Sequence, residues 1–125
     1  MAALTLADSR QAIAEGRTVV AVCGQCAARQ TIPSETCFTC GSADLSIRPH
    51  DGRGRVFSWV VCHFAFAEQY RAETPYTVVL VALDGGARVY GRYDAGSPPL
   101  QADMTLALDP AATKAKGYLV YRPAE

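Results

Sequence analysis

Residues 23–40, CGQCAARQTIPSETCFTC, contain two C-x-x-C motifs, one at Cys23 and Cys26 and one at Cys37 and Cys40. Each motif turns tightly enough to direct two thiolates at one ion, and two facing motifs give the tetrahedral four-sulfur shell that zinc prefers. The spacing therefore predicts one metal ion bound by all four cysteines. Because a closed four-sulfur shell has no open position for substrate, we expect a structural role. Its binding free energy, on the order of 10 kcal/mol, would hold together a segment with little core of its own.

Zinc is the ion that we expect, but iron fits the same sulfur geometry, so the spacing leaves the identity of the ion open. A redox-active C-x-x-C motif is a weaker alternative. One pair of cysteines would suffice for redox chemistry, and no thioredoxin-like βαβ pattern surrounds either pair.

The segment before the cysteines predicts a short helix from residue 5 to about residue 15. Thr5 and Asp8 have the spacing of a capping box, and Gly16 suits the left-handed conformation that ends many helices. The apolar stripe of this helix is weak, so we expect it to fold against another part of the chain. The stripe consists of Ala3, Leu6 and Ile13.

Strand-like segments separated by turn signals follow the cysteine motifs. Residues 84–86, Asp-Gly-Gly, predict a hairpin turn because glycine supplies the positive φ that such turns require. Five short strands at hairpin spacing with little helix favour a small closed barrel, which has no exposed sheet edge. The predicted strands are residues 54–67, 75–83, 87–93, 104–108 and 118–121.

The faces of these strands differ. The third strand alternates, which predicts one solvated face carrying Arg88, Tyr90 and Arg92. The first strand is apolar on both faces, and a barrel of this size can bury only one of them in its core. The helix, the ribbon or another protein must cover the other, and the sequence leaves these possibilities open. One face is predicted to carry Val56, Val60, Cys62, Phe64 and Phe66, and the opposite face Phe57, Trp59 and Val61.

Net charge argues against a nucleic-acid ligand. The 12 basic residues of the 125-residue chain are balanced by 12 acidic ones, whereas proteins that bind nucleic acids usually carry a basic excess. The strip of Arg88, Tyr90 and Arg92 keeps a module that binds single-stranded nucleic acid as an alternative.

No apolar run approaches the roughly 20 residues that span a bilayer. The N-terminus also lacks the pattern of a signal peptide, so we expect a cytoplasmic protein that does not enter the membrane.

Residues that could carry catalysis are few. Cys62 and His63 are adjacent, so on a strand they point to opposite faces and cannot form a nucleophilic pair. Cys62 is therefore predicted to be a small buried apolar residue. Arg53 and Arg55, near Arg48, could hold a phosphate through their guanidinium groups, although a solvated turn explains them equally well. The sequence contains no self-contained catalytic machinery.

Several segments, in this order, resemble the family called domain of unknown function 35. The likeness covers nearly the whole chain. It begins at Glu15-Gly16-Arg17 and continues through the two C-x-x-C motifs. It then includes Gly52-Arg-Gly-Arg-Val-Phe-Ser58, the segment from Pro75 to Arg88, and Tyr118-Leu-Val-Tyr-Arg-Pro123.

This resemblance implies a mainly β fold with an N-terminal helix (residues 1–16), a rubredoxin-like zinc ribbon (17–47) and a five-stranded OB-fold barrel (48–125). Cys23, Cys26, Cys37 and Cys40 match the family's metal ligands one for one. Members of the family are similar to accessory subunits of enzymes that process acyl-CoA, either thiolase-type enzymes or MaoC-type hydratases. In these complexes the OB-fold docks on the catalytic subunit and helps to form the route for the CoA thioester.

The function that the resemblance implies is a non-catalytic accessory subunit in a hetero-oligomer. Its partner would be a thiolase-type enzyme of fatty acid, steroid or aromatic acyl-CoA metabolism, or alternatively a MaoC-type enoyl-CoA hydratase. The ligand of the complex would be a coenzyme A thioester. Contact with this ligand or with the partner is expected at Arg53, Arg55, Phe64, Phe66, Tyr70 and Arg71.

Overall fold

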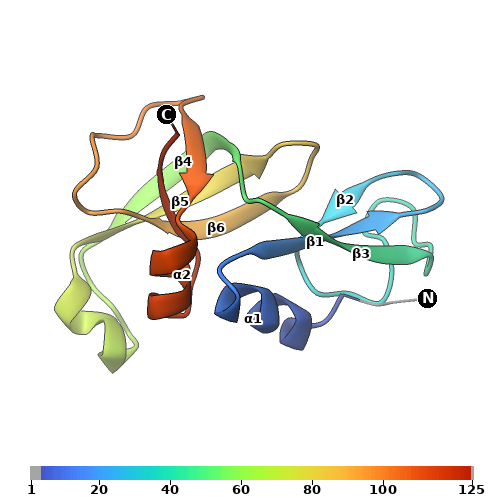
Figure 1. Cartoon of the computed structure of the whole chain (residues 1–125), viewed down its shortest axis with the longest axis horizontal. Coiled ribbons are helices and arrows are strands. Elements are labelled where there is room, and N and C mark those ends of the chain that lie inside the picture. Colours follow the sequence, from blue (N-terminus) through green and yellow to red (C-terminus); the bar gives the residue numbers. More distant parts are fainter. Residues whose placement is uncertain (1–3, 125) are drawn as a thin grey trace.

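A computed structural model describes residues 4–124, and Figure 1 shows a small sheet beside a barrel. The three-stranded sheet has the order β2-β1-β3, and the closed five-stranded barrel has the order β4-β5-β6-β8-β7. The fold is mainly β with an N-terminal helix, a four-cysteine cluster and a closed five-strand barrel, which confirms the predicted class. The elements are α1 (Leu6–Ala14), β1 (Thr18–Cys23), β2 (Arg29–Gln30), β3 (Leu45–His50), β4 (Gly54–Cys62), the 3-10 helix η1 (Glu68–Glu73), β5 (Tyr76–Leu83), β6 (Arg88–Tyr93), β7 (Thr105–Leu108), α2 (Pro110–Lys116) and β8 (Val120–Pro123).

Strand β1 is shared between two cores. Val20 belongs to the barrel core, while Val19 and Ala21 belong to the core of the small sheet. Successive side chains on a strand point to opposite faces, so β1 packs against the barrel on one face and against the cysteine loops and α1 on the other. Both faces are buried, which explains why the sequence of β1 is apolar without alternation.

Helix α1 begins with the predicted capping box. The Asp8 N–H donates to Thr5 Oγ1 at 3.2 Å, and the Thr5 N–H donates to Asp8 Oδ2 at 2.9 Å. Gly16 has a φ of +76°, as expected for the residue that follows the helix end. The predicted apolar stripe is wrong in part, because Leu6 is exposed and the small Ala12 is the fully buried residue. Ala3 lies outside the described residues.

A histidine joins the small sheet to the barrel. His50 is the last residue of β3, and its Nε2 lies 2.8 Å from the Asp84 carbonyl oxygen in the turn between β5 and β6. The Gly52 N–H donates to His50 Nδ1 at 2.8 Å, so Nδ1 is the acceptor and Nε2 carries the proton that is donated to Asp84. Both ring nitrogens are therefore used at the junction.

A bulge in β4 changes which residues share a face. The register with β5 shifts between Val56 and Ser58, and after the shift Trp59 pairs with Val79. Paired residues of antiparallel strands lie on the same face, so Trp59 shares the face of the core residue Val79. The predicted division of the faces of this strand is therefore wrong beyond Phe57, because the bulge adds one residue. The strand also ends at Cys62, so Phe64 and Phe66 lie in a loop rather than in the strand.

Helix α2 was not predicted, although its sequence carries helix signals. Asp109 is the N-cap and its Oδ1 accepts from the Ala112 N–H at 3.0 Å. Pro110 occupies the first helical turn, and Gly117 ends the helix with a φ of +78°. Figure 1 shows α2 close to α1, and the Gly16 backbone lies against Pro110.

Neither α1 nor α2 is long and apolar enough to cross a membrane, and the same holds for every helix in residues 4–124.

Gly91 on β6 is a strand position of the barrel where a larger residue does not fit. A Cβ at Gly91 would lie 2.6 Å from Cδ2 of Tyr121, which is fully buried. Replacing Gly91 by alanine would therefore force the tyrosine ring or β6 to move. Gly96 offers a matched control, because nothing lies within 4 Å of the Cβ that alanine would add there.

We predict that Gly91→Ala lowers the free energy of unfolding by about 1–3 kcal/mol, as overpacking of a core does, whereas Gly96→Ala leaves it within about 0.5 kcal/mol. Urea unfolding followed by circular dichroism measures both variants. Equal stability of the two would mean that the packing of Tyr121 against β6 is not tight.

Candidate metal centre and cleft

The four cysteines of the C-x-x-C motifs come together in the fold. The Sγ atoms of Cys23 and Cys40 are 3.6 Å apart, and so are those of Cys26 and Cys37. All four sulfur atoms lie within 4.8 Å of one another. A tetrahedral ion with metal–sulfur bonds of about 2.3 Å requires sulfur–sulfur separations of ~3.8 Å. The cluster therefore has the donor set and the dimensions of a four-thiolate metal site.

The backbone around the cysteines favours thiolates. The Gln25 N–H lies 3.4 Å from Cys23 Sγ, and the Thr39 N–H lies 3.4 Å from Cys37 Sγ. Backbone N–H groups of Cys40 and Thr39 lower the pKa of Cys37 to about 6. Hydrogen bonds to sulfur stabilise the charged form, so the backbone favours thiolates at Cys23 and Cys37. Burial and the neighbouring sulfur atoms raise the pKa of Cys26 and Cys40 instead. Cys23 and Cys37 are buried and Cys26 and Cys40 are exposed, so the cluster lies at the surface of the small sheet.

Apolar side chains remain exposed along β4 and the loop that follows it. Phe66 is 91% exposed, and the other members of the group are between 56% and 65% exposed. The rings of Phe64 and Phe66 pack edge to face with their centroids 5.0 Å apart. The Arg88 guanidinium lies over the Phe57 ring, but all four side chains remain largely open to solvent. We call this group the apolar ridge; it consists of Phe57, Val60, Phe64 and Phe66. Trp59 and Val61 are also exposed, but they line the cleft described next.

A cleft of about 830 Å³ opens at the end of the barrel beside the ridge. Its walls come from β4 to β6, from the loop between β4 and β5, from the loop after β6 and from α2. In five-stranded barrels of the OB type, the loops after the first and fourth strands commonly frame the ligand site. Here those loops contain η1 and α2. The cleft contains both aromatic and charged side chains, among them Trp59, Tyr76, Arg92, Lys116 and Tyr118.

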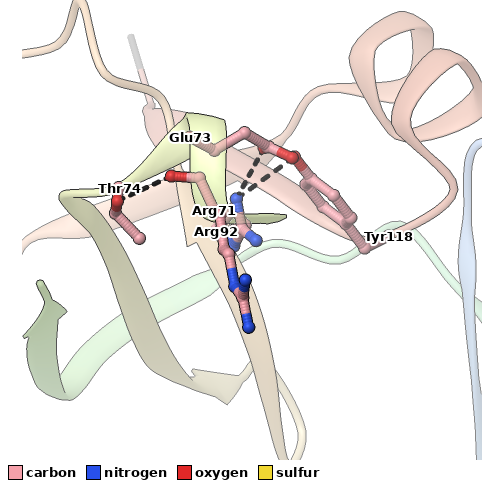
Figure 2. Close-up of polar contacts among 5 residues, drawn as sticks. All are labelled: Arg71, Glu73, Thr74, Arg92 and Tyr118. Carbon is pink, nitrogen blue, oxygen red and sulfur yellow. Dashed lines mark hydrogen bonds and ion pairs between the residues drawn. The ribbon is translucent and has the colours of Figure 1, made fainter. Parts of the chain in front are cut away.

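A polar cluster lies in this cleft, and Figure 2 shows how its residues converge. Glu73 Oε1 accepts from Arg92 Nη1 at 2.9 Å and from the Tyr118 hydroxyl at 2.6 Å. The Arg92 guanidinium also lies over three tyrosine rings, with Cζ 3.5 Å from the centroid of Tyr76, 4.5 Å from that of Tyr118 and 5.0 Å from that of Tyr70. One cation is therefore held by a carboxylate and by aromatic faces.

Comparison with known proteins identifies the family. Residues 48–109 match the family described as the C-terminal OB-fold domain of ChsH2. A solved structure described as the Ltp2-ChsH2(DUF35) aldolase matches with a TM-score of 0.72 and 28% identity, over 95% of this chain and 94% of that chain. DUF35 denotes domain of unknown function 35. The chain belongs to the DUF35 family.

Two further relatives extend the comparison. A DUF35 protein of unknown function from Sulfolobus solfataricus has a TM-score of 0.65 over 93% of this chain and 82% of its own, and at 9% identity it shows the fold alone. A protein of Thermomonospora curvata named "Probable enoyl-CoA hydratase alpha subunit" is 30% identical over 100 residues, which is 79% of this chain. The DUF35 chain spans only 31% of the length of that relative.

The structure divides the predicted contact residues of this DUF35 chain into two groups. Arg53 and Arg55 are exposed near the start of β4. Phe64, Phe66, Tyr70 and Arg71 lie beyond its other end, where Arg71 Nε contacts the Ala65 carbonyl oxygen at 3.5 Å and Tyr70 packs against Tyr118. Most of β4 lies between the two groups.

The cleft residues Trp59, Glu73 and Tyr118 were not predicted to be functional, and Arg92 was assigned to a solvated face and to the strip that could bind single-stranded nucleic acid. Glu73 and Tyr118 are 45 residues apart in sequence, so no local spacing could have shown their contact. The one available signal was the concentration of tyrosines near predicted strand ends.

Cys62 and the histidines do not form a nucleophilic pair in this fold. Cys62 is partly exposed at the end of β4, which corrects the prediction of a buried residue. His63 is exposed, and His50 is held near the start of β4 by Gly52 and Asp84.

The carboxylate of Glu73 gives the barrel a pH-dependent contact. Hydrogen bonds from Tyr118 and Arg92 lower the pKa of Glu73 below its usual value of 4.5. Burial and the hydrogen bond to Glu73 raise the pKa of Tyr118 to about 12, so its hydroxyl remains a donor at neutral pH. A carboxyl group whose pKa is lower in the folded than in the unfolded state stabilises the fold at any pH above its pKa in the unfolded state. This stabilisation is lost as the pH falls through the pKa in the folded state.

We therefore predict that Glu73→Gln is less stable than the wild type at pH 7 and that the difference shrinks between pH 4.5 and pH 3. Urea unfolding of both proteins at several pH values measures the difference, and protonation of the cysteines affects both proteins alike. A difference that stays constant down to pH 3 would contradict the assigned ionisation.

Proposed function

We propose that this DUF35 chain is a non-catalytic accessory subunit that docks on a thiolase-type catalytic subunit in the cytoplasm and assists the binding or channelling of an acyl-CoA. The observation that carries this proposal is the apolar ridge. Exposed patches of this kind on a small domain mark sites of protein interaction, because solvation of large apolar side chains is unfavourable. A closed barrel with a complete core has no other need for these residues.

One structural zinc ion would be bound by Cys23, Cys26, Cys37 and Cys40. The sulfur separations and the N–H groups directed at Cys23 and Cys37 support a tetrahedral four-thiolate site. Four thiolates complete the shell of zinc, so the ion would stabilise the loops rather than meet a substrate. Iron remains the alternative occupant of the same donor set.

The nature of the catalytic partner is argued from the relatives. One similar structure is described as an aldolase that contains ChsH2, and one relative is named as a subunit of an enoyl-CoA hydratase. Both descriptions favour a subunit of an enzyme complex, and the second favours acyl-CoA chemistry. A thiolase-type partner is our first choice, and a MaoC-type hydratase is the alternative that the same experiment would identify.

Contacts to the partner or to its acyl-CoA are proposed at both ends of β4. Phe64 and Phe66 would enter an apolar surface of the partner, with Tyr70 and Arg71 beside them. Arg53 and Arg55 would contribute positive charge at the other end, where they are free to meet a phosphate.

Binding of single-stranded nucleic acid is less well supported. Of the three residues of the predicted strip, Arg92 is already paired with Glu73, and the Arg88 guanidinium lies 4.3 Å from the centroid of the Phe57 ring. Tyr90 alone is free to stack on a base, which is a small surface for this kind of ligand.

The metal is tested by removing one ligand. We predict that the purified chain holds one zinc ion and that Cys37→Ser loses it, together with the fold of residues 23–50. The binding energy of such sites, on the order of 10 kcal/mol, exceeds what the small core can replace. Elemental analysis and limited proteolysis measure the two effects. Cys62→Ser is the matched control and should keep the ion. A wild-type chain without stoichiometric metal would refute the site.

The docking role is tested by co-expression with the product of an adjacent gene and identification of the protein that co-purifies. We predict that the double variant Phe64→Ser, Phe66→Ser raises the dissociation constant of that complex by about tenfold or more, as the loss of buried aromatic anchors does. Calorimetry on the purified subunits measures it.

Leu6→Ser is the matched control, because Leu6 is a large exposed apolar residue on α1, outside the ridge. It should bind as the wild type does. If the double variant binds normally, the ridge is not the docking surface. If the isolated chain turns over an acyl-CoA, the role is not an accessory one.

A further inference from the structure

Arg92 is oriented by the barrel rather than by its carboxylate partner. Tyr76 lies on β5 and Tyr118 lies just before β8, and their rings are the two nearest to the guanidinium. Stacking on aromatic faces restricts the plane of a guanidinium, so its N–H groups are directed before any anion arrives. Arg92 would therefore keep its orientation if Glu73 moved away.

The donors of this guanidinium are not all used. Both hydrogen bonds of the Arg92 side chain come from Nη1, one to Glu73 and one to the Tyr118 oxygen. Within residues 4–124, Nε and Nη2 have no hydrogen-bond partner. Because a guanidinium carries five N–H donors, the site can hold a further oxygen.

Glu73 comes from an element without buried side chains. It is the last residue of η1, an element that buries none of its residues. Only its Oε1 atom receives the two donors. The Glu73 side chain is 32% exposed and that of Arg92 is 14% exposed, so solvent reaches the ion pair. Contacts of this kind open at low cost in free energy, so the carboxylate can exchange with another anion.

The surroundings of the pair suit a ligand. Glu73, Arg92 and Tyr118 all line the 830 Å³ cleft, as does Lys116, which is exposed and has no ion-pair partner within residues 4–124. Trp59 and Tyr76 add aromatic walls. The oxyanion of a ligand could pair with the cations in the cleft, and the apolar part of the same ligand could pack against the aromatic rings.

We infer that Arg92 and Tyr118 form an oxyanion-binding subsite in this cleft, which Glu73 occupies in the free chain and from which the phosphate or carboxylate of a ligand displaces it. Displacement breaks the hydrogen bonds between η1 and the barrel. Ligand binding would thereby loosen the segment that carries Phe64 and Phe66, which would be held by the packing of Tyr70 on Tyr118 and by the buried Ala65 alone. This inference does not depend on the partner or on the acyl-CoA role.

The test uses Trp59, the only tryptophan of the chain, which lines the same cleft. The full metal-loaded chain is titrated with inorganic phosphate, and in a second arm with acetate, at constant ionic strength while tryptophan fluorescence is recorded. We predict a saturable change in Glu73→Gln at a concentration about tenfold or more below that of the wild type, because the variant removes the internal competitor.

Two further variants complete the series. Arg92→Gln should lose the saturable change, and Tyr118→Phe, which keeps the ring but not the hydroxyl, should weaken it severalfold. Arg10→Gln is the control, since Arg10 is exposed on α1, does not line the cleft and should not alter the titration. Thermal melting of each variant verifies folding. If Arg92→Gln does not fold, the titration of Tyr118→Phe decides whether the subsite binds the anion.

Saturation by either anion with this order of variants supports the subsite. Equal midpoints for the wild type and Glu73→Gln would overturn it, and so would a response that survives Arg92→Gln. Absence of a response in both the wild type and Glu73→Gln would also overturn it. In each of these cases the Glu73–Arg92 pair is a structural tether only.

Discussion

The burial of β1 on both faces is the constraint on which the rest of the structure depends. One face supplies Val20 to the barrel core, and the other supplies Val19, Ala21 and Cys23 to the core beneath the cysteine loops. The small sheet cannot move relative to the barrel without exposing one of these faces. The hydrogen bond from His50 to Asp84 fixes the same junction at the far end of β3. The four-cysteine cluster, the barrel and the cleft thus belong to one framework.

Features set by short-range rules could be predicted from the sequence. The capping box at Thr5 and Asp8 and the turn at residues 84–86 each depend on neighbours within a few residues, and the structure contains both. The predicted alternation of β6 holds from Arg88 to Gly91 but fails at Arg92, whose side chain is 14% exposed. Spacing alone also predicted that the four cysteines would converge. Strand β3 was missed because it contains Pro49, which is tolerated there since β3 is an edge strand of the small sheet. Helix α2 was missed although Asp109, Pro110 and Gly117 mark its ends.

Features that depend on the pairing of distant segments could not be predicted from the sequence. The bulge at Phe57 arises from the register between β4 and β5, which no pattern within β4 reveals. The bulge changes the face on which Trp59 lies. Without the bulge, Trp59 would point away from the barrel axis, whereas with it Trp59 lines the cleft. An apolar strand that looked two-sided in sequence therefore contributes to two surfaces, the exposed ridge and the aromatic wall of the cleft.

The two surfaces are mechanically joined by the segment between β4 and β5. Phe64 and Phe66 lie at its start and Glu73 near its end, and within residues 4–124 the hydrogen bonds of Glu73 to Arg92 and Tyr118 are its side-chain polar links to the barrel. A change in the occupancy of Arg92 would change how firmly this segment is held, because the remaining contacts of η1 with the barrel are those of the partly exposed Tyr70 ring with Tyr118 and Arg92. A partner bound at the ridge and an anion bound in the cleft would act on the same few contacts. By thermodynamic linkage, each would then alter the affinity of the other.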